Sequence, residues 1–234
     1  MQKVIVTALL LLLVTTCTFC RAQSVQQDLT LKYVAAIPSQ KAAKTPIIIL
    51  LHSYGSDEQD MFGLKNTFPP NYLIVSARAP YPISGAGFQW FDLHKADAQS
   101  EINSSSAQIV KFIAEVVTKY KADSRQVYLM GFSQGAMMSL QVGLKNPDKV
   151  KGVGILSGRL FPALKNEIKV TPALKNLKIF IGHGTADERI KFQEGKDAVE
   201  YLQSIGLKPD FHAYSGMKHA ISNDELKDLQ NWLK

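Results

Sequence analysis

The run from Pro46 to Leu51 is apolar throughout and rich in β-branched isoleucine. Such a run is typical of a strand buried on both faces, as occurs when helices cover both sides of a mostly parallel sheet. Strand-like segments recur at 72–75, 126–130, 150–156, 177–181 and 210–214. Helix-like segments lie between several of them. This alternation predicts an α/β domain with a mostly parallel central sheet and helices on both faces.

Helical spacing predicts where several of the helices lie. Apolar residues at 109, 113, 116, 117 and 120 indicate an amphipathic helix over 104–120. Further helices are predicted after 133 to about 144, at 192–204 and at 222–233. The last of these begins with a candidate capping box of Ser222 and Glu225. Alternation at Leu29, Leu31 and Tyr33 predicts an edge strand near the beginning of the domain.

Length and charge limit the number of domains and the partners. A chain of 234 residues with 46% hydrophobic residues can bury one substantial core, so we expect one domain. The net charge is +7, but the lysines are spread along the chain without a long basic run. A nucleic-acid partner is therefore not expected. We expect a monomer or a homodimer that acts on a small-molecule substrate.

The first residues resemble a secretory signal. Lys3 precedes a largely apolar run from Val4 to Val14, and the small residues Cys20 and Ala22 would precede a cut. This predicts a signal peptide at 1–22, a domain at 23–234, and a periplasmic or secreted protein. A membrane anchor is the alternative, but the run is shorter than the roughly 20 apolar residues of a spanning helix. No stable membrane insertion is expected after cleavage.

Cleavage after residue 22 would also remove both cysteines, Cys17 and Cys20. The mature chain would then have no disulfide and no thiol. A cysteine nucleophile and a thiolate metal site are therefore not expected.

The segment Gly131-Phe132-Ser133-Gln134-Gly135 matches G-x-S-x-G. In the α/β-hydrolase fold this motif places a nucleophilic serine on a sharp turn between a strand and a helix. A strand-like segment precedes the motif here and a helix-like segment follows it. Such a short motif also arises by chance as a glycine-rich turn, but its context favours Ser133 as a nucleophile.

A serine nucleophile needs a base, and the base needs a carboxylate that fixes its tautomer. In this fold they follow in the order serine, acid, histidine, on loops after later strands. Asp187 and His219 meet this order and are the candidate acid and base. The competing acids precede the serine in the chain: Asp57, Asp60 and Asp92. Among the other histidines, we expect His52 and His183 to hold loops by hydrogen bonds, and His94 and His212 to have no part in the chemistry.

Several motifs resemble the phospholipase/carboxylesterase family, which includes the acyl-protein thioesterases, within the dienelactone hydrolase-like α/β-hydrolases. They are LLHSYGSDEQDMF (50–62), RAPYP (78–82), GFSQGAMMSL (131–140), GHGTAD (182–187) and GLKPDFHAYSGMKHAIS (206–222). The resemblance implies an α/β-hydrolase fold and a catalytic triad of Ser133, Asp187 and His219. It also implies an oxyanion hole made by the backbone N–H groups of Tyr54 and Gln134.

The chain departs from the family at Ser53, where members usually have a glycine that gives the oxyanion loop its freedom. The family is also largely cytoplasmic, whereas this chain begins with an apparent export signal. Trp90 has two interpretations. The family commonly places an aromatic residue here near the acyl pocket, which would make Trp90 a substrate-binding residue; the alternative is a buried core tryptophan.

The predicted activity is hydrolysis of carboxylic esters or thioesters with short to medium acyl chains, through an acyl-serine intermediate and without metal or cofactor. The alternatives are a serine peptidase of related fold and a catalytically silent hydrolase-fold binding protein. The segment 157–176 is too short for a large lid. We expect it to form a shallow apolar wall from Leu160, Phe161 and Leu164.

Overall fold

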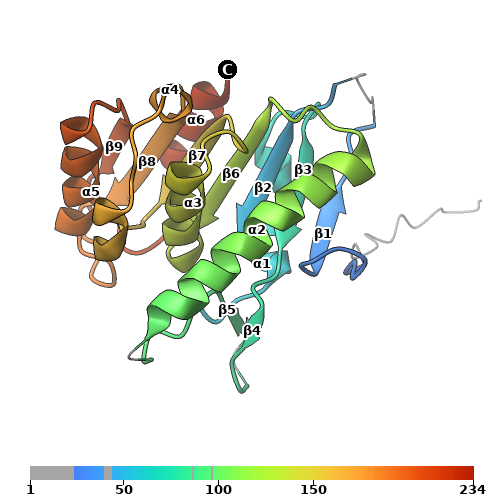
Figure 1. The fold of residues 1–234 in the computed structure, drawn as a ribbon, viewed down its shortest axis with the longest axis horizontal. Helices are drawn as coiled ribbons and strands as arrows, with labels where there is room; N and C mark the ends of the chain where they lie inside the picture. The colour runs from blue at the N-terminus through green and yellow to red at the C-terminus, as the bar shows by residue number, and fades with distance from the viewer. Residues whose placement is uncertain (1–23, 40–43, 86, 96) are drawn as a thin grey trace, which may run out of the picture.

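One central sheet organises the protein. The computed structural model describes residues 24–39, 44–85, 87–95 and 97–234. In these residues a seven-stranded sheet has the order β1-β3-β2-β6-β7-β8-β9 (Figure 1). Its strands are β1 (Tyr33–Ala36), β2 (Ile47–Leu51), β3 (Leu73–Ala77), β6 (Val127–Phe132), β7 (Gly152–Leu156), β8 (Lys178–Gly184) and β9 (Asp210–Tyr214). All neighbours pair in parallel except β1, which is antiparallel to β3. The predicted mostly parallel sheet is confirmed.

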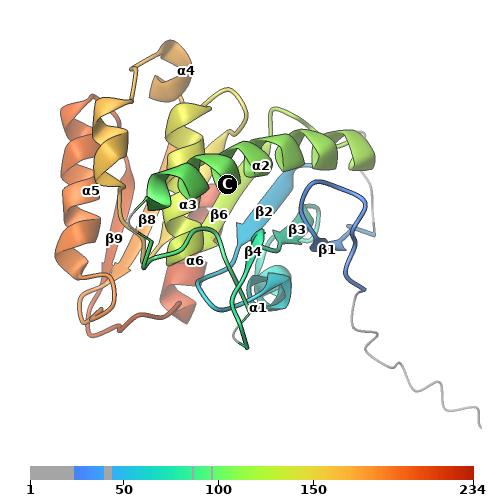
Figure 2. The same cartoon turned by 60° about the horizontal axis from the view of Figure 1, so that its bottom comes forward.

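Helices cover both faces of this sheet. The helices α2 (Ala98–Tyr120), α3 (Gln134–Lys145) and α5 (Phe192–Ser204) lie on one face, and α1 (Glu58–Phe62) and α6 (Asn223–Leu233) lie on the other (Figures 1 and 2). The remaining short elements are the 3-10 helices η1 (Gly63–Thr67) and η2 (Pro162–Asn166), the helix α4 (Pro172–Lys175), and a hairpin of β4 (Tyr81–Pro82) and β5 (Phe88–Gln89). This is the α/β-hydrolase architecture predicted from the motifs.

The apolar run in β2 shows why the core has two halves. Successive side chains of a strand point to opposite faces. Ile47 and Ile49 therefore pack in the core under α2, α3 and α5, and Ile48 and Leu50 pack in the core on the α1 and α6 side. All four side chains are fully buried. The sheet is thus held between two apolar layers, which fixes the position of the loops at its carboxyl edge.

The helix predicted at 104–120 begins earlier, at Ala98. The apolar periodicity is broken in its first turns, where Ser105 and Ser106 are buried in place of apolar residues. The hydroxyl of Ser105 donates to the carbonyl of Trp90 at 2.5 Å. A buried hydroxyl with a hydrogen-bond partner avoids the cost of desolvation. Ser105 can therefore face the core, although the apolar pattern of the sequence does not mark it as a core position.

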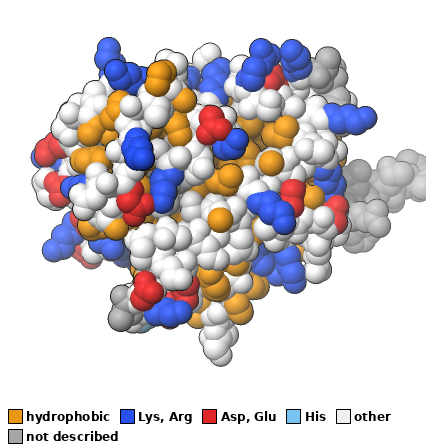
Figure 3. All heavy atoms as spheres, viewed as in Figure 1, with side chains coloured by type: hydrophobic (Ala, Val, Ile, Leu, Met, Phe, Trp, Pro, Cys, Tyr) orange, Lys and Arg blue, Asp and Glu red, His pale blue; other side chains and the backbone are white. Residues whose placement is uncertain are grey.

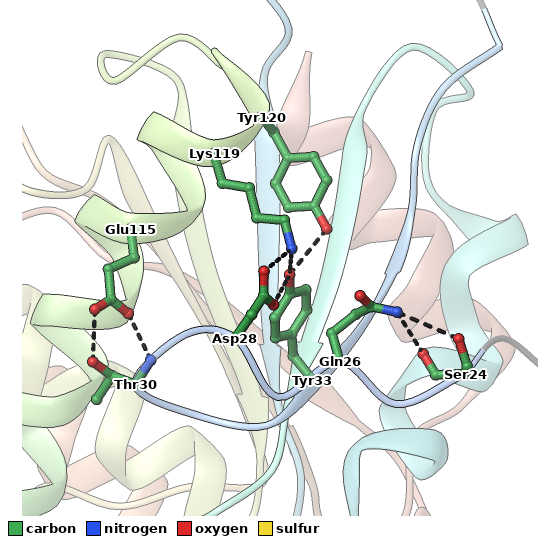
Figure 4. Close-up of polar contacts among 8 residues, drawn as sticks. All are labelled: Ser24, Gln26, Asp28, Thr30, Tyr33, Glu115, Lys119 and Tyr120. Carbon is green, nitrogen blue, oxygen red and sulfur yellow. Dashed lines mark hydrogen bonds and ion pairs between the residues drawn. The ribbon is translucent and has the colours of Figure 1, made fainter.

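Hydrogen bonds to α2 hold the residues that precede β1, and the predicted edge strand over 29–33 begins only at Tyr33. The carboxylate of Glu115 accepts from both the backbone N–H and the hydroxyl of Thr30, at 2.7 and 2.8 Å (Figure 4). Lys119 donates to Asp28 and to the hydroxyl of Tyr33, both at 2.6 Å. These contacts replace the ladder that a longer β1 would form.

The segment 157–176 contains only the short η2 and α4. Leu160, Phe161 and Leu164 are 8%, 6% and 1% exposed and belong to the core on the α3 side. The prediction that they form the wall of a substrate site is therefore wrong, because the sheet offers an apolar layer that buries them instead.

The surface shown in Figure 3 carries lysine and arginine side chains scattered among other types, without one large basic patch on that face. In the described part of the chain, no helix is both long and apolar enough to cross a membrane. The signal peptide predicted at 1–22 lies outside the described residues.

Candidate active site

Ser133 lies at the sharp turn between β6 and α3. Its backbone has φ 55° and ψ −114°, and it is one of few non-glycine residues with positive φ in the described ranges. A non-glycine residue in such a conformation is strained and is typical of functional sites. The backbone N–H of Ser133 donates to the carbonyl of Leu156 at 3.0 Å, which ties the turn to β7.

The two glycines of the motif are required by close approach of backbone atoms. A Cβ on Gly131 would lie 2.2 Å from the carbonyl carbon of Gly135, and one on Gly135 would lie 2.1 Å from the carbonyl oxygen of Leu51. Neither contact is sterically allowed. The G-x-S-x-G pattern therefore lets β2, β6 and the first turn of α3 meet around Ser133.

His219 lies between Ser133 and Asp187. Its Nε2 is 2.9 Å from the hydroxyl oxygen of Ser133, and its Nδ1 is 2.7 Å from Oδ2 of Asp187. The structure thus brings together the three residues that the sequence predicts. With Nδ1–H donating to the carboxylate, the lone pair of Nε2 faces the serine hydroxyl, which is the arrangement that nucleophilic catalysis by serine requires.

Asp187 is buried, at 6% exposure. Its other oxygen, Oδ1, accepts from the backbone N–H groups of Arg189 and Ile190 at 2.9 and 3.0 Å. Burial would raise the pKa of this carboxyl, but the hydrogen bonds from His219 and from the two backbone groups outweigh it, so the pKa lies below its ordinary value. Asp187 is therefore a fixed negative charge beside the imidazole.

The other two histidines at this edge hold loops, as predicted. His183 is fully buried, and its Nε2 lies 2.8 Å from the carbonyl of Ile190, in the loop that carries Asp187. His52 accepts from the backbone N–H of Ala79 at Nε2 and donates to the carbonyl of Ser53 at Nδ1. Burial lowers the pKa of His52, so its ring is neutral.

The acid loop and the base loop approach closely because Gly184 has no side chain. A Cβ at Gly184 would lie 2.1 Å from the carbonyl oxygen of Met217. In addition, the ring of Phe132 packs against the imidazole of His219 with centroids 4.8 Å apart. These contacts fix the position of the base, and no sequence motif indicates either of them.

Two backbone N–H groups near Ser133 are without an acceptor among the described residues: those of Tyr54 and Gln134. Gln134 opens α3, and the first N–H groups of a helix have no partner within it. The positive end of the helix dipole lies at the same place. Ser53, which precedes Tyr54, does not have a positive φ. A serine therefore fits where the family usually has a glycine.

Trp90 is fully buried and does not line the pocket at Ser133. Its Nε1 donates to the carbonyl of His52 at 3.0 Å, and its ring packs against the ring of His52. The structure therefore favours the core tryptophan over a substrate-binding residue. The side chain of Gln134 has a role that no sequence motif indicates: it accepts from the N–H of Trp90 and donates to the carbonyl of Phe91, both at 2.7 Å.

A pocket of about 570 Å³ opens at Ser133. Its volume is within the range of sites that bind small molecules, and it combines apolar and polar side chains as such sites do. The residues that line it are Ser53, Tyr54, Leu93, Phe132, Ser133, Gln134, Met137, Arg159, Arg189, Ile190 and His219.

Two charged residues in this pocket, Arg159 and Arg189, were not predicted. Both follow strands at the edge that carries Ser133, since Arg159 lies after β7 and Arg189 lies after β8. The rule that identified Asp187 and His219 by their place after a strand would also have identified them. Among the described residues, no group of three or more His, Cys, Asp or Glu side chains is placed to hold a metal ion.

Comparison with known proteins identifies relatives along most of the chain. The family model described as Phospholipase/Carboxylesterase matches residues 32–234. An acyl-protein thioesterase 1 of Debaryomyces hansenii is 32% identical over 182 residues, which are 73% of this chain and 78% of the relative. A probable carboxylesterase of Oryza sativa subsp. japonica is 27% identical over 215 residues, 86% of this chain and 81% of the relative.

Solved structures show the same fold. The crystal structure of esterase PE8 matches with a TM-score of 0.73 and 26% identity, over 86% of this chain and 95% of that chain. A carboxylesterase from Mesorhizobium loti matches with a TM-score of 0.75 and 22% identity, over 90% of this chain and 98% of that chain.

These comparisons correct one prediction, that of a periplasmic or secreted protein. The relatives include acyl-protein thioesterases of several fungi, and none of the comparisons supports a signal peptide. The prediction of export was based on the first 22 residues alone, where a lysine followed by an apolar run is the pattern of a signal peptide. This pattern is unspecific, which is why the prediction is wrong.

Proposed function

The chain belongs to the phospholipase/carboxylesterase family of serine hydrolases, and on that premise we propose that it hydrolyses esters or thioesters with short to medium acyl chains through an acyl-serine intermediate. In this proposal Ser133 is the nucleophile, His219 the base and Asp187 the acid that orients it. The observation that carries it is the continuous chain of contacts from Ser133 Oγ to His219 at 2.9 Å and from His219 to Asp187 at 2.7 Å.

The reaction has two steps that the same residues perform. His219 takes the hydroxyl proton as Ser133 Oγ bonds to the carbonyl carbon, and the carbonyl oxygen becomes an oxyanion. When the tetrahedral intermediate collapses, the bond to the alcohol or thiol breaks and His219 returns the proton to this leaving group. Water then attacks the acyl-serine in the same way, which releases the carboxylic acid and restores the hydroxyl of Ser133.

The oxyanion would bind the backbone N–H groups of Tyr54 and Gln134. Both lack an acceptor among the described residues, so they are available to a substrate oxygen without breaking another bond. Preorganised donors of this kind are among the largest contributions to catalysis of acyl transfer. The amino terminus of α3 adds its dipole at the same place.

The preference for short to medium acyl chains is supported by the pocket. Its apolar side chains come from Leu93, Phe132, Met137 and Ile190. Each methylene buried against them contributes roughly 0.8 kcal/mol until the apolar surface ends. Catalytic efficiency is therefore expected to rise with acyl length and then to level off, without a jump in rate when the substrate aggregates.

Two other functions are alternatives. A serine peptidase would use the same three residues on an amide. A silent binding protein has a precedent among the relatives, because one of them, from Oryza sativa subsp. japonica and 23% identical, is named a probable inactive carboxylesterase. The hydrogen-bonded serine, histidine and aspartate of this chain favour hydrolysis over silent binding.

A fluorophosphonate probe and a series of p-nitrophenyl esters test the proposal. Ser133→Ala is expected to lose labelling and about five to six orders of magnitude of kcat, as triad nucleophiles do. Ser104→Ala, at an exposed serine of α2, is the matched control and is expected to keep both. Labelling of Ser133→Ala, or hydrolysis of amides but not of esters, would contradict the proposal.

A further inference from the structure

The pocket at Ser133 is lined by positively charged side chains. Arg159 and Arg189 line it, and no aspartate or glutamate of the described ranges does so. Asp187 lies behind His219 and is buried. A substrate that enters the pocket therefore meets positive charge and apolar surface together.

Of these two arginines, Arg189 has the positive charge that is less neutralised by a partner. It follows Asp187 in the acid loop, and its backbone N–H donates to that carboxylate at 2.9 Å. Its exposed side chain forms no ion pair and no hydrogen bond with any other described residue. The loop that positions the catalytic acid thus also places a free guanidinium at the wall of the pocket.

Arg159 is held in place by an ion pair. Its Nη1 lies 2.6 Å from Oε1 of Glu194, and the two side chains are 43% and 32% exposed. The second oxygen of Glu194 accepts from the backbone N–H of Lys191 at 3.0 Å, which anchors the carboxylate at the beginning of α5. A guanidinium has five N–H donors, and Glu194 engages one of them. The others remain available to a ligand.

Building on the proposed ester hydrolysis, we propose that this site is selective for esters or thioesters that carry a carboxylate in addition to the scissile bond. The apolar stem of such a substrate lies against Phe132, Met137 and Ile190, and its carboxylate is bound by Arg159 and Arg189. Planar guanidinium groups match the geometry of a carboxylate and bind it with charge-assisted hydrogen bonds. The carboxylate belongs to the acyl part or to the alcohol part, and each has its own arm in the test.

The test compares kcat/KM for two matched pairs of substrates. In the acyl arm, p-nitrophenyl hydrogen glutarate is compared with p-nitrophenyl methyl glutarate. In the alcohol arm, 4-acetoxybenzoate is compared with methyl 4-acetoxybenzoate. For each pair, kcat/KM for the anionic ester is divided by kcat/KM for the neutral ester. The intrinsic reactivities of the two esters cancel when this ratio for a variant is divided by the same ratio for the wild type.

We expect Arg189→Gln and Arg159→Gln each to lower the anionic-to-neutral ratio of kcat/KM about fivefold in one arm. A loss of this size corresponds to the free energy of a partly exposed ion pair. Arg189→Lys keeps the charge and is expected to retain most of the preference. Arg125→Gln is the matched control, because Arg125 lies before β6, at the opposite edge of the sheet from Ser133, and it is expected to leave both ratios unchanged. Added NaCl should lower the wild-type ratio in the same arm, which requires no variant.

Each outcome distinguishes the inference from the proposed function. If the wild type hydrolyses none of the four esters, the proposed function fails. If it hydrolyses the neutral esters while both ratios are insensitive to the arginine substitutions and to salt, the selectivity for a carboxylate is wrong and the esterase function stands. A loss confined to one arm supports the proposal and assigns the carboxylate to that part of the substrate.

Discussion

The side chain of Gln134 holds the backbone of Trp90: its Oε1 accepts from the N–H of Trp90 at 2.7 Å. Its Nε2 donates to the carbonyl of Phe91 at the same distance. The residue whose backbone N–H is proposed to bind the oxyanion thus also fixes the loop that follows β5. The residue is 2% exposed, so both hydrogen bonds form away from water.

Gln134→Ala keeps the backbone N–H and removes both side-chain hydrogen bonds. The variant leaves buried groups of the Trp90 loop without partners, and it is expected to lower the free energy of unfolding by about 1–3 kcal/mol. Urea denaturation followed by tryptophan fluorescence measures this. Gln193→Ala, which removes an exposed amide from α5, is the control and should change stability far less. Equal effects of the two substitutions would show that the buried contacts contribute nothing.

Asp187→Asn should leave the fold intact and lower kcat about 10⁴-fold, because an amide no longer fixes the productive tautomer of the base. Initial rates on an activated ester measure the loss, and circular dichroism checks the fold. Asp197→Asn, at an exposed position of α5, is the control. An active Asp187→Asn enzyme would mean that another carboxylate orients His219.

Gly135→Ala is expected to abolish activity and to destabilise the protein, because its Cβ would lie 2.1 Å from the carbonyl oxygen of Leu51. Gly63→Ala is the matched control, since a Cβ there meets nothing within 4 Å and its φ is −53°. Thermal unfolding and ester hydrolysis are measured for both. A folded and active Gly135→Ala protein would show that β2 and α3 are not packed as closely as described.

Glu225 is predicted to make stability depend on pH. Ser222 caps α6 by accepting from the backbone N–H of Glu225 at 3.1 Å, but the Glu225 carboxyl is buried without a hydrogen bond of its own among the described residues. The predicted capping box is therefore only half formed. Burial, assisted by the negative charge of Asp228, raises the pKa of Glu225 to about 8, although the Ser222 backbone acts in the opposite direction.

In the unfolded chain the pKa of a glutamate is about 4.3. The folded protein therefore binds one more proton than the unfolded chain between that pH and about 8. The contribution of Glu225 to the free energy of unfolding is full below the pKa of the unfolded chain. It is lost as the pH rises toward the pKa of the folded protein, with a slope of up to about 1.4 kcal/mol per pH unit. Glu225→Gln should remove this slope and be the more stable protein above pH 8. Urea denaturation from pH 5 to 9 measures it, and parallel curves for variant and wild type would contradict it.

The sequence by itself determined the fold and the order of the three candidate catalytic residues. The apolar run at Pro46–Leu51 requires a strand covered on both faces, and the carboxyl ends of parallel strands share one edge. Ser133, Asp187 and His219 each follow such a strand, so their meeting follows from topology. The glycine at 131 is also explained locally, because a Cβ there would meet Gly135 in the same turn, whereas the glycine at 135 is required by its close approach to Leu51 in β2.

Only the tertiary structure decided what surrounds these residues. Trp90 and Phe161 are apolar side chains that suit a pocket wall as well as a core, and the difference depends on whether the adjacent layer has space for them. The position of Arg159 likewise depends on Glu194, which is 35 residues away in the chain. Packing and ion pairing of this kind join segments that are distant in sequence, and local patterns contain no information about them. Which of the charged residues that follow strands line the pocket is therefore decided by the folded chain.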